Sequence, residues 1–186
     1  GTPSLAAALQ ALRKEGVRRV RVLPLYPQYS TTTTASVADA ITKHGEGLHI
    51  EMLQDYHRDR DWASAVAQSI RAHWDVQGRG ERLLLSFHGI PQRLVDAGDP
   101  YAAQCEASTV AIAEALGIPR SELLLTFQSR FGKERWLQPY TQQALEALGR
   151  EGVRTIDVAC PGFAVDCLET LEEIAVENAH AFAAAG

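Results

Sequence analysis

The sequence predicts an α/β protein built on a parallel, doubly wound sheet, or on pieces of two such sheets. Apolar, strand-like segments alternate with amphipathic, helix-like segments along the chain, and the connections between them are short. The three leucines at 83–85 form an apolar run that is long enough for a strand buried on both faces, as is typical of parallel sheets. Gly89 and Pro91 then stop that strand.

The first part of the chain is expected to hold two strands and three helices. Apolar residues spaced three and four apart favour a helix over 4–15, and Gly16 is a natural helix stop. Short apolar runs favour strands at 20–26 and 48–53. Asp61 is expected to cap the third helix. The intervening segments are a polar loop at 28–34 and a helix at 35–43.

The second part of the chain continues the same alternation after the strand that ends at His88. A loop runs through 98–100, and a helix over 101–116 is stopped by Gly117. The remaining expected elements are strands at 122–127 and 153–159 and helices at 139–150 and 165–183.

The last expected helix has two opposite faces when it is drawn with α-helical periodicity. Its apolar residues predict one buried stripe, formed by Leu168, Leu171, Ala175, Ala179 and Phe182. Its acidic residues form the other stripe, with Asp166, Glu169, Glu173 and Glu177 spaced three or four apart. This acidic stripe is either an ordinary solvated face or a ladder of carboxylates that leads from a cleft and handles cations or protons.

Composition and charge exclude several classes of function. The 186 residues are 46% hydrophobic and 22% charged, as in ordinary globular proteins. The net charge is −5 and the longest basic run is Arg18-Arg19, so nucleic acid is not an expected partner. No apolar run approaches the roughly 20 residues of a membrane span, and Gly1-Thr2-Pro3 does not open a signal peptide.

The three cysteines are expected to be reduced thiols in a cytoplasmic protein. Their odd number and wide spacing argue against a disulfide framework, and no C-x-x-C pair indicates a zinc or cluster site. Cys160 and Cys167 are better interpreted as small buried hydrophobes than as metal ligands.

Chemistry-bearing residues follow three of the expected strands. Because the carboxyl ends of parallel strands meet at one edge, the loops at 27–34, 87–91 and 161–166 are candidates for a common site. His88 either caps its strand or faces a ligand there. Trp136 is either a core residue or the wall of a flat aromatic pocket.

Four motifs together resemble the ferrochelatase family, in its bacterial type. They are LPLYPQYS at 23–30, SFHGIP at 86–91, TFQSRFG at 126–132 and CPGFAVDCLETLEEI at 160–174. The likeness covers almost the whole chain, in the right order. It implies two Rossmann-like lobes in a chelatase-like architecture, with residues 1–60 the C-terminal part of the first lobe and 61–186 the second. It also implies a lyase that inserts ferrous iron into protoporphyrin IX and releases two protons, as the last step of haem synthesis.

The resemblance assigns roles to individual residues. His88 and Glu169 match the family's catalytic and metal-binding histidine and glutamate, and Asp166 and Glu173 match acidic positions that run from the site. Residues expected to contact the tetrapyrrole are Tyr29, Ser30, Ile90, Trp136 and Phe163. Fe²⁺ is expected as a substrate with no organic cofactor. Peripheral association with a membrane surface and the oligomeric state are left open.

The chain departs from the family pattern in three ways, one of which is Lys133-Glu134-Arg135 before Trp136, where a proline is common. Cys167 stands where some members have a second histidine, so a two-histidine metal site is not expected. The beginning of the first lobe and the C-terminal tail, which carries an iron–sulfur cluster in some members, are expected to be missing, so a cluster is not supported. The alternatives are a related chelatase, acting on coproporphyrin with iron or on sirohydrochlorin with cobalt, or an inactive tetrapyrrole-binding fragment.

Overall fold

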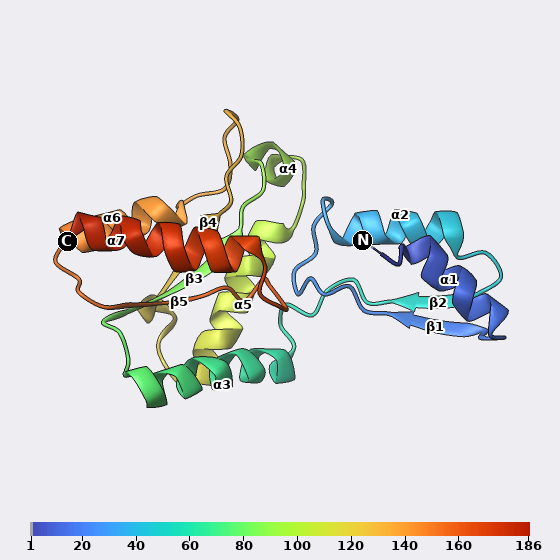
Figure 1. Ribbon diagram of the computed structural model, residues 1–186, viewed down its shortest axis with the longest axis horizontal. Coiled ribbons are helices and arrows are strands. Elements are labelled where there is room, and N and C mark those ends of the chain that lie inside the picture. The colour runs from blue at the N-terminus through green and yellow to red at the C-terminus, as the bar shows by residue number, and fades with distance from the viewer. Residues whose placement is uncertain (1) are drawn as a thin grey trace. The chain divides into compact units, whose positions relative to one another are not determined.

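A computed structural model of the chain describes residues 2–186 (Figure 1). The chain divides into two compact units, Gly1–Tyr56 and His57–Gly186. Each unit contains parallel strands with helices packed beside them, so the predicted α/β class with parallel sheets is confirmed. Among the described residues, none of the helices combines the length and the apolar character that crossing a bilayer requires.

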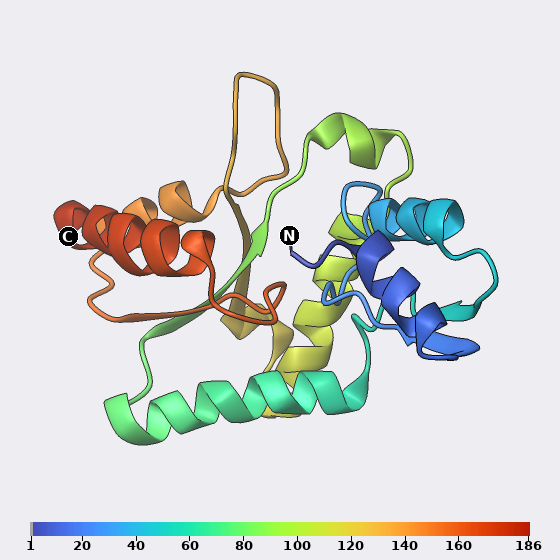
Figure 2. The same ribbon diagram turned by 45° about the vertical axis from the view of Figure 1, so that its right-hand side comes forward.

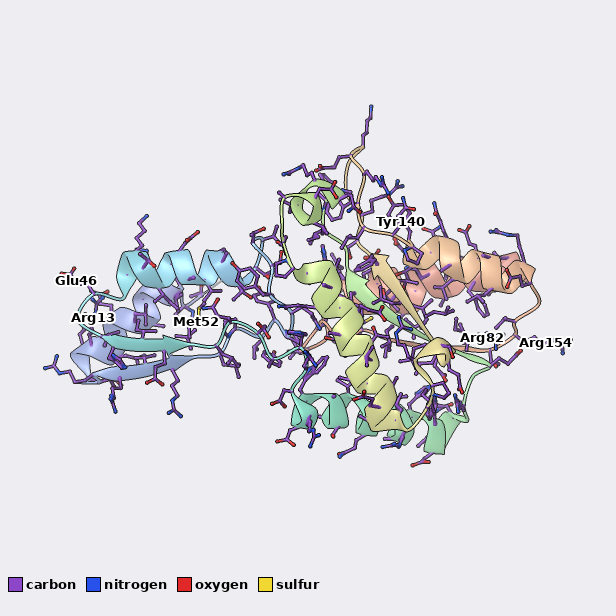
Figure 3. All side chains as sticks on the ribbon, turned by 180° about the vertical axis from the view of Figure 1, so that it is seen from behind. Arg13, Glu46, Met52, Arg82, Tyr140 and Arg154 are labelled. Carbon is purple, nitrogen blue, oxygen red and sulfur yellow. The ribbon has the colours of Figure 1, made fainter. Side chains whose placement is uncertain are left out.

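The first unit is a two-stranded parallel sheet with two helices. Its elements are α1 (Leu5–Lys14), β1 (Arg19–Val22), α2 (Thr34–His44) and β2 (His49–Met52). Helix α1 begins at a Ser4 cap, whose hydroxyl accepts a hydrogen bond from the Ala7 amide at 3.2 Å. Arg13 Nη1 donates to the Glu46 carbonyl at 2.6 Å, and both residues are labelled at the same end of this unit in Figure 3.

The first strand is shorter than the apolar pattern predicts. The expected strand at 20–26 pairs with its neighbour only as far as Val22, and the following residues form a loop. Pro24 and Pro27 lack the amide hydrogens that further ladder bonds would need, which explains the early end of β1. The apolar Leu23 and Leu25 are consequently exposed in this loop.

The second unit contains a three-stranded parallel sheet whose middle strand is the leucine-rich one. Its strands are β3 (Arg82–His88), β4 (Leu123–Gln128) and β5 (Ile156–Ala159), in the order β4-β3-β5. The register pairs Ser86 with Thr126 and His88 with Gln128. Figure 3 labels Arg82 and Arg154 near the amino end of the sheet and Tyr140 near the opposite end, where β4 finishes.

Helices cover both faces of this sheet (Figures 1 and 2). On one face lie α3 (Arg60–Gln77) and α5 (Tyr101–Leu116), and on the other lie α6 (Thr141–Arg150), η2 (Glu169–Asn178) and α7 (Ala179–Ala185). Two short helices, α4 (Gln92–Asp96) and η1 (Arg120–Glu122), lie in the connections. The core is formed by buried side chains of β3, β4 and α5, among them Leu85, Phe87, Cys105, Ile112 and Phe127.

Several predicted boundaries are corrected by the structure. Asp59, not Asp61, caps α3, because its Oδ1 accepts from the Trp62 amide at 2.9 Å. Helix α4 was not predicted, since a five-residue helix shows little periodicity. Strand β5 begins three residues later than expected, and α6 begins at Thr141 rather than at 139.

The largest correction concerns the last helix. The predicted α-helix at 165–183 is a π-helix, η2, followed directly by α7. Leu168 and Leu171 of the predicted buried stripe are 73% and 56% exposed, whereas Ile174 and Asn178 are buried. A π-helix bonds each amide five residues back and holds more residues per turn, so spacings read as α-helical assign the wrong face.

Candidate active site

The site is built around His88, the last residue of the central strand β3. Its imidazole is half-buried, and Nδ1 lies 2.6 Å from the Gly89 carbonyl oxygen. A carbonyl can only accept a hydrogen bond, so this contact requires the proton on Nδ1. The neutral ring therefore keeps a lone pair on Nε2, which can accept a proton or bind a metal.

Two aromatic rings flank the imidazole. The centroids of Trp136 and Phe163 each lie 6.4 Å from that of His88, and both rings are tilted against it by 47° and 46°. Gly89 permits this close packing, because a Cβ there would lie 2.9 Å from the Gln128 carbonyl and 3.2 Å from Trp136 Cε3. The structure thus brings together three residues that the sequence pointed to separately.

Ile90 and the indole nitrogen of Trp136 complete this side of the site. Ile90 is 5% exposed in the core cluster, and its carbonyl accepts from the Leu137 amide at 3.0 Å, which fixes the segment that carries Trp136. Trp136 Nε1 is buried and has no hydrogen-bond partner within residues 2–186. A buried N–H without an acceptor is costly, so it marks a place where an acceptor from a ligand would be favourable.

Glu169 is the first residue of η2 and is half-buried. A hydrogen bond with the Cys167 side chain is the main cause that lowers the pKa of the Glu169 carboxyl, and its own backbone amide acts in the same direction. Burial raises this pKa, and His88 in its protonated form lowers it, as the weakest of the four causes. The carboxyl is therefore ionised at neutral pH. The influence of His88 on this pKa also indicates that the two groups interact electrostatically.

Glu173, one turn further along η2, is held by two short hydrogen bonds. The backbone amide and the hydroxyl of Ser129 each donate to its carboxylate at 2.6 Å. Ser129 adopts a φ of 63°, a left-handed conformation that is uncommon for residues other than glycine. This strained residue aims both donors at one carboxylate, so Glu173 is fixed in place rather than free in solvent.

Polar side chains behind His88 form a chain of hydrogen bonds that sequence reasoning did not detect. Ser86 Oγ donates to Gln128 Oε1 at 2.7 Å and lies 2.8 Å from Thr141 Oγ1, which in turn lies 2.9 Å from Thr126 Oγ1. All four side chains are buried. Gln128 Nε2 donates to the Glu169 carbonyl at 3.2 Å. The available signal was the occurrence of Ser86 and Thr126 inside otherwise apolar strands.

Cys160, beside the site, is held as a protonated thiol. Burial raises the pKa of Cys160 to about 12, and the charges of Cys167, Glu173 and Asp166 act in the same direction. Cys160 Sγ contacts Gln128 Oε1 at 3.6 Å, and a cavity of about 450 Å³ lies beside it and Phe163. No group of three or more His, Cys, Asp or Glu side chains suited to holding a metal occurs in the part of the chain that the structure describes.

Tyr29 and Ser30 belong to the first unit. Ser30 is buried, and its hydroxyl accepts from the Thr32 amide at 3.1 Å and lies 2.9 Å from the Thr32 hydroxyl. Its carbonyl accepts from the amides of Thr33 and Ala35, so Ser30 organises the turn that leads into α2. The expected contact of Tyr29 and Ser30 with a tetrapyrrole stays a prediction.

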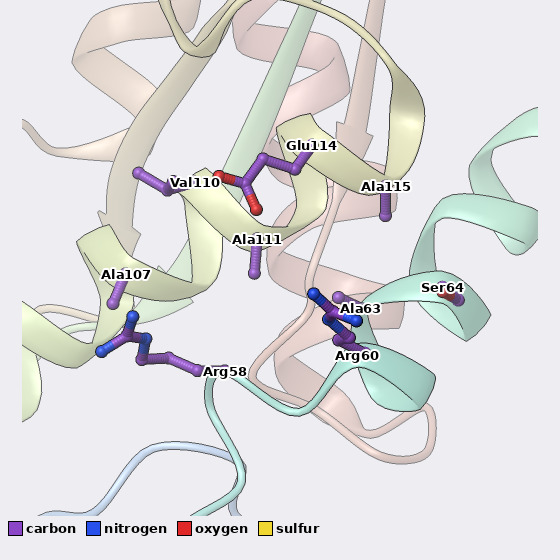
Figure 4. Close-up of a pocket in the computed structure, with 9 residues that line it drawn as sticks. All are labelled: Arg58, Arg60, Ala63, Ser64, Ala107, Val110, Ala111, Glu114 and Ala115. Carbon is purple, nitrogen blue, oxygen red and sulfur yellow. The ribbon is translucent and has the colours of Figure 1, made fainter.

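A second hollow lies between α3 and α5, away from the strand ends (Figure 4). It measures about 460 Å³, and its floor is formed by small side chains such as Ala63 and Ala111. Arg58, Arg60 and Glu114 point toward it from the rim. Its lining includes neither a histidine nor an aromatic ring that could pack against a flat ligand, so the chemistry is better sought at His88.

Comparison with known proteins places the whole chain in one family. The family model described as Ferrochelatase matches residues 1–186. A protein named Ferrochelatase from Stenotrophomonas maltophilia is 58% identical over 179 residues, which is 95% of this chain and 56% of the relative. One with the same name from Xylella fastidiosa is 53% identical over 189 residues, covering 100% of this chain and 59% of the relative. The chain thus spans a little more than half the length of these relatives.

A solved structure shares the fold at much lower identity. SirB from Bacillus subtilis with Fe³⁺ superposes with a TM-score of 0.65 over 99% of this chain and 67% of that one, at 16% sequence identity. At this identity, the likeness supports the chelatase-like fold alone.

Proposed function

Because the chain belongs to the ferrochelatase family, we propose that the natural protein containing it inserts ferrous iron into protoporphyrin IX and releases two protons, in the last step of haem synthesis. The observation that carries this proposal is the imidazole of His88. Its Nε2 lone pair can accept a proton, two aromatic rings flank it, and the Glu169 carboxylate lowers the energy of the positive charge that such a proton brings.

The reaction must remove two pyrrole N–H protons while the metal enters the ring. Neutral His88 is suited to accept such a proton, because its Nε2 keeps a lone pair and imidazole is the most frequent general base in enzymes. Its Nδ1–H remains bonded to the Gly89 carbonyl, which keeps Nε2 as the accepting atom and stabilises the imidazolium that forms. We therefore assign proton acceptance to His88 Nε2.

Glu169 supplies the negative charge of the site. Its lowered pKa keeps the carboxylate ionised, so it can hold the incoming cation or stabilise protonated His88. The tetrapyrrole itself offers four nitrogen ligands, so the protein does not need a complete metal-binding cluster to deliver iron. His88 and Glu169 are the two catalytic residues in this proposal.

The flat, apolar macrocycle would pack against Trp136 and Phe163, over the floor that Ile90 supports. The unpaired Nε1–H of Trp136 would gain an acceptor there, which offsets the cost of its burial. Tyr29 and Ser30 are proposed as contacts from the first unit.

We also propose a cytoplasmic location and a reaction without an organic cofactor. The three cysteines are free thiols, which is typical of a reducing compartment. Peripheral attachment to a membrane, through which an apolar tetrapyrrole would be exchanged, belongs to the same proposal.

Visible absorbance spectroscopy of the natural protein tests this function. Protoporphyrin IX should shift its absorbance on binding, and ferrous iron should then convert it to haem. Preferred turnover of coproporphyrin with iron, or of sirohydrochlorin with cobalt, would replace this substrate assignment with that of a related chelatase. Binding of tetrapyrrole without insertion of any metal would reduce the protein to a binding module.

A further inference from the structure

The side chain of Gln128 links the two residues that the proposed function requires. Gln128 is the last residue of β4, lies opposite His88 in the sheet register and is 3% exposed. Its backbone carbonyl accepts from the Gly89 amide at 2.8 Å, directly after His88. Its side-chain Nε2 donates to the Glu169 carbonyl at 3.2 Å. One residue thus contacts the strand end that carries His88 and the first turn of the helix that carries Glu169.

The orientation of this amide is determined by its partners. The Glu169 carbonyl can only accept, so Nε2 must face it, and Oε1 must face the Ser86 hydroxyl and the Cys160 thiol. Ser86 uses its only proton on Gln128, so Thr141 must donate to Ser86 and Thr126 can donate to Thr141. The chain of hydroxyls therefore ends on Gln128 Oε1 and leaves Nε2 to donate to the helix.

The π-helix needs such outside support. Its hydrogen-bond geometry is poorer than that of an α-helix, and long π-helices are rare. The Glu169 carbonyl accepts from Gln128 Nε2, which lies outside the helix, at 3.2 Å. The Glu173 carbonyl accepts at 2.7 Å from Nδ2 of Asn178, the last residue of η2 itself, so the first turn is the part of the helix that a buried amide from another element holds. Glu169 and Glu173 are the two η2 residues whose carboxylates have defined partners near the site.

We propose that Gln128 is a positioning residue, which holds the first turn of η2 so that the Glu169 carboxylate faces the site of His88. This inference rests on the proposed chelatase function for its catalytic consequence, but the physical tether does not depend on it. Gln128 itself touches neither the metal nor the tetrapyrrole in this account. Its loss should therefore slow metal insertion without weakening tetrapyrrole binding.

The test compares Gln128→Leu and Gln128→Met with a matched control, Thr126→Val, in the natural protein. Leucine and methionine occupy a similar volume but cannot donate to the Glu169 carbonyl, and methionine adapts to the cavity with little strain. Thr126→Val removes a hydroxyl from the far end of the same buried chain, where it contacts neither Gln128 nor Glu169. Two readouts are needed: metal-insertion kinetics, and hydrogen exchange of the amides at 170–178.

For both Gln128 variants we expect kcat to fall about tenfold to a hundredfold, while the tetrapyrrole dissociation constant stays within about twofold. Hydrogen exchange of the amides at 170–178 should accelerate about tenfold. Thr126→Val should stay within about twofold in kcat and exchange. Wild-type kcat and exchange in the Met variant would overturn the inference, as would an equal loss in the control. If wild-type protein inserts no metal, the proposed function fails, and exchange still decides whether the tether exists.

Discussion

Strand β3 and helix η2 each carry one half of the proposed site, but they are held in place by different means. β3 pairs with β4 up to His88 and with β5 over its first four residues, and its residues 83–87 are buried, so the sheet fixes the position of His88. η2 buries only Ile174 and Asn178, and side chains from β4 and its following loop hold Glu169 and Glu173. The strand end is therefore robust to substitution of its neighbours, whereas the direction of Glu169 depends on a few individual contacts.

The largest effect on metal insertion should come from substituting His88, at the end of β3. His88→Ala removes the proposed proton acceptor and should lower metal insertion about 10²–10⁴-fold, while tetrapyrrole binding persists through the flanking rings. His73→Ala is the matched control, because His73 lies outside the site and pairs with Asp157 at 3.7 Å. Insertion kinetics and absorbance titrations measure the two effects, and wild-type rates in His88→Ala would remove the imidazole from the mechanism.

The next comparison separates the true buried face of η2 from the one that α-helical periodicity predicts. Ile174→Ala should lower the free energy of unfolding by about 2–4 kcal/mol, because it opens a cavity under the helix. Leu171→Ala should cost less than about 0.5 kcal/mol, since Leu171 is largely exposed. Urea unfolding of the 186-residue chain measures both. A larger loss of unfolding free energy in Leu171→Ala than in Ile174→Ala would mean that the buried face is the one that α-helical periodicity predicts.

A smaller effect is expected at Ser129, which fixes Glu173 from a strained backbone. Ser129→Ala removes the hydroxyl donor and should destabilise the chain by about 1 kcal/mol. Ser129→Gly loses the same donor but relieves the positive φ, so it should be about 1 kcal/mol more stable than the alanine variant. Equal unfolding free energies for the two variants would mean that the left-handed conformation is not maintained.

The smallest effect concerns the charge of Glu169. Its pKa is lowered chiefly by the Cys167 hydrogen bond, so Cys167→Ala should move the pKa back up toward its ordinary value. His88→Ala should move it in the same direction by less. The stabilisation linked to this lowered pKa is present at neutral pH and is lost as the pH falls through the folded-state value. Carboxyl NMR titration checks the sign, and an unchanged pKa in Cys167→Ala would exclude the thiol as its cause.

Strand β3 and the position of His88 at its end could be predicted, because the residues that determine them are adjacent in the sequence. Three leucines followed by Gly89 and Pro91 define both the strand and its end, and the parallel topology places His88 at the sheet edge. The strand-end argument also placed Phe163 near His88, whereas the approach of Trp136 to His88 was available only through the family resemblance. Gln128 was missed because a polar residue at a strand end gives no sign of the partner that its amide will reach.

The π-helical form of η2 and its buried face could not be predicted in the same way. The spacing of its apolar residues fits an α-helix, and single residues carry little information that distinguishes i→i+4 from i→i+5 bonding. Contacts from outside the helix also hold η2, among them the bonds from Gln128 to the Glu169 carbonyl and from Ser129 to the Glu173 carboxylate, and local spacing does not reveal these. For this reason a helix was predicted in this part of the chain, but its π-helical form and its buried face were not.

The central claim is that a tetrapyrrole lies against His88 with its nitrogens within reach of Nε2. A crystal structure of the natural protein with a bound tetrapyrrole tests this directly. We expect a macrocycle in contact with Trp136 and Phe163, a pyrrole nitrogen within hydrogen-bond distance of His88 Nε2, and Glu169 facing the same ring. A macrocycle bound elsewhere, or an imidazole whose Nε2 points away from it, would contradict the account.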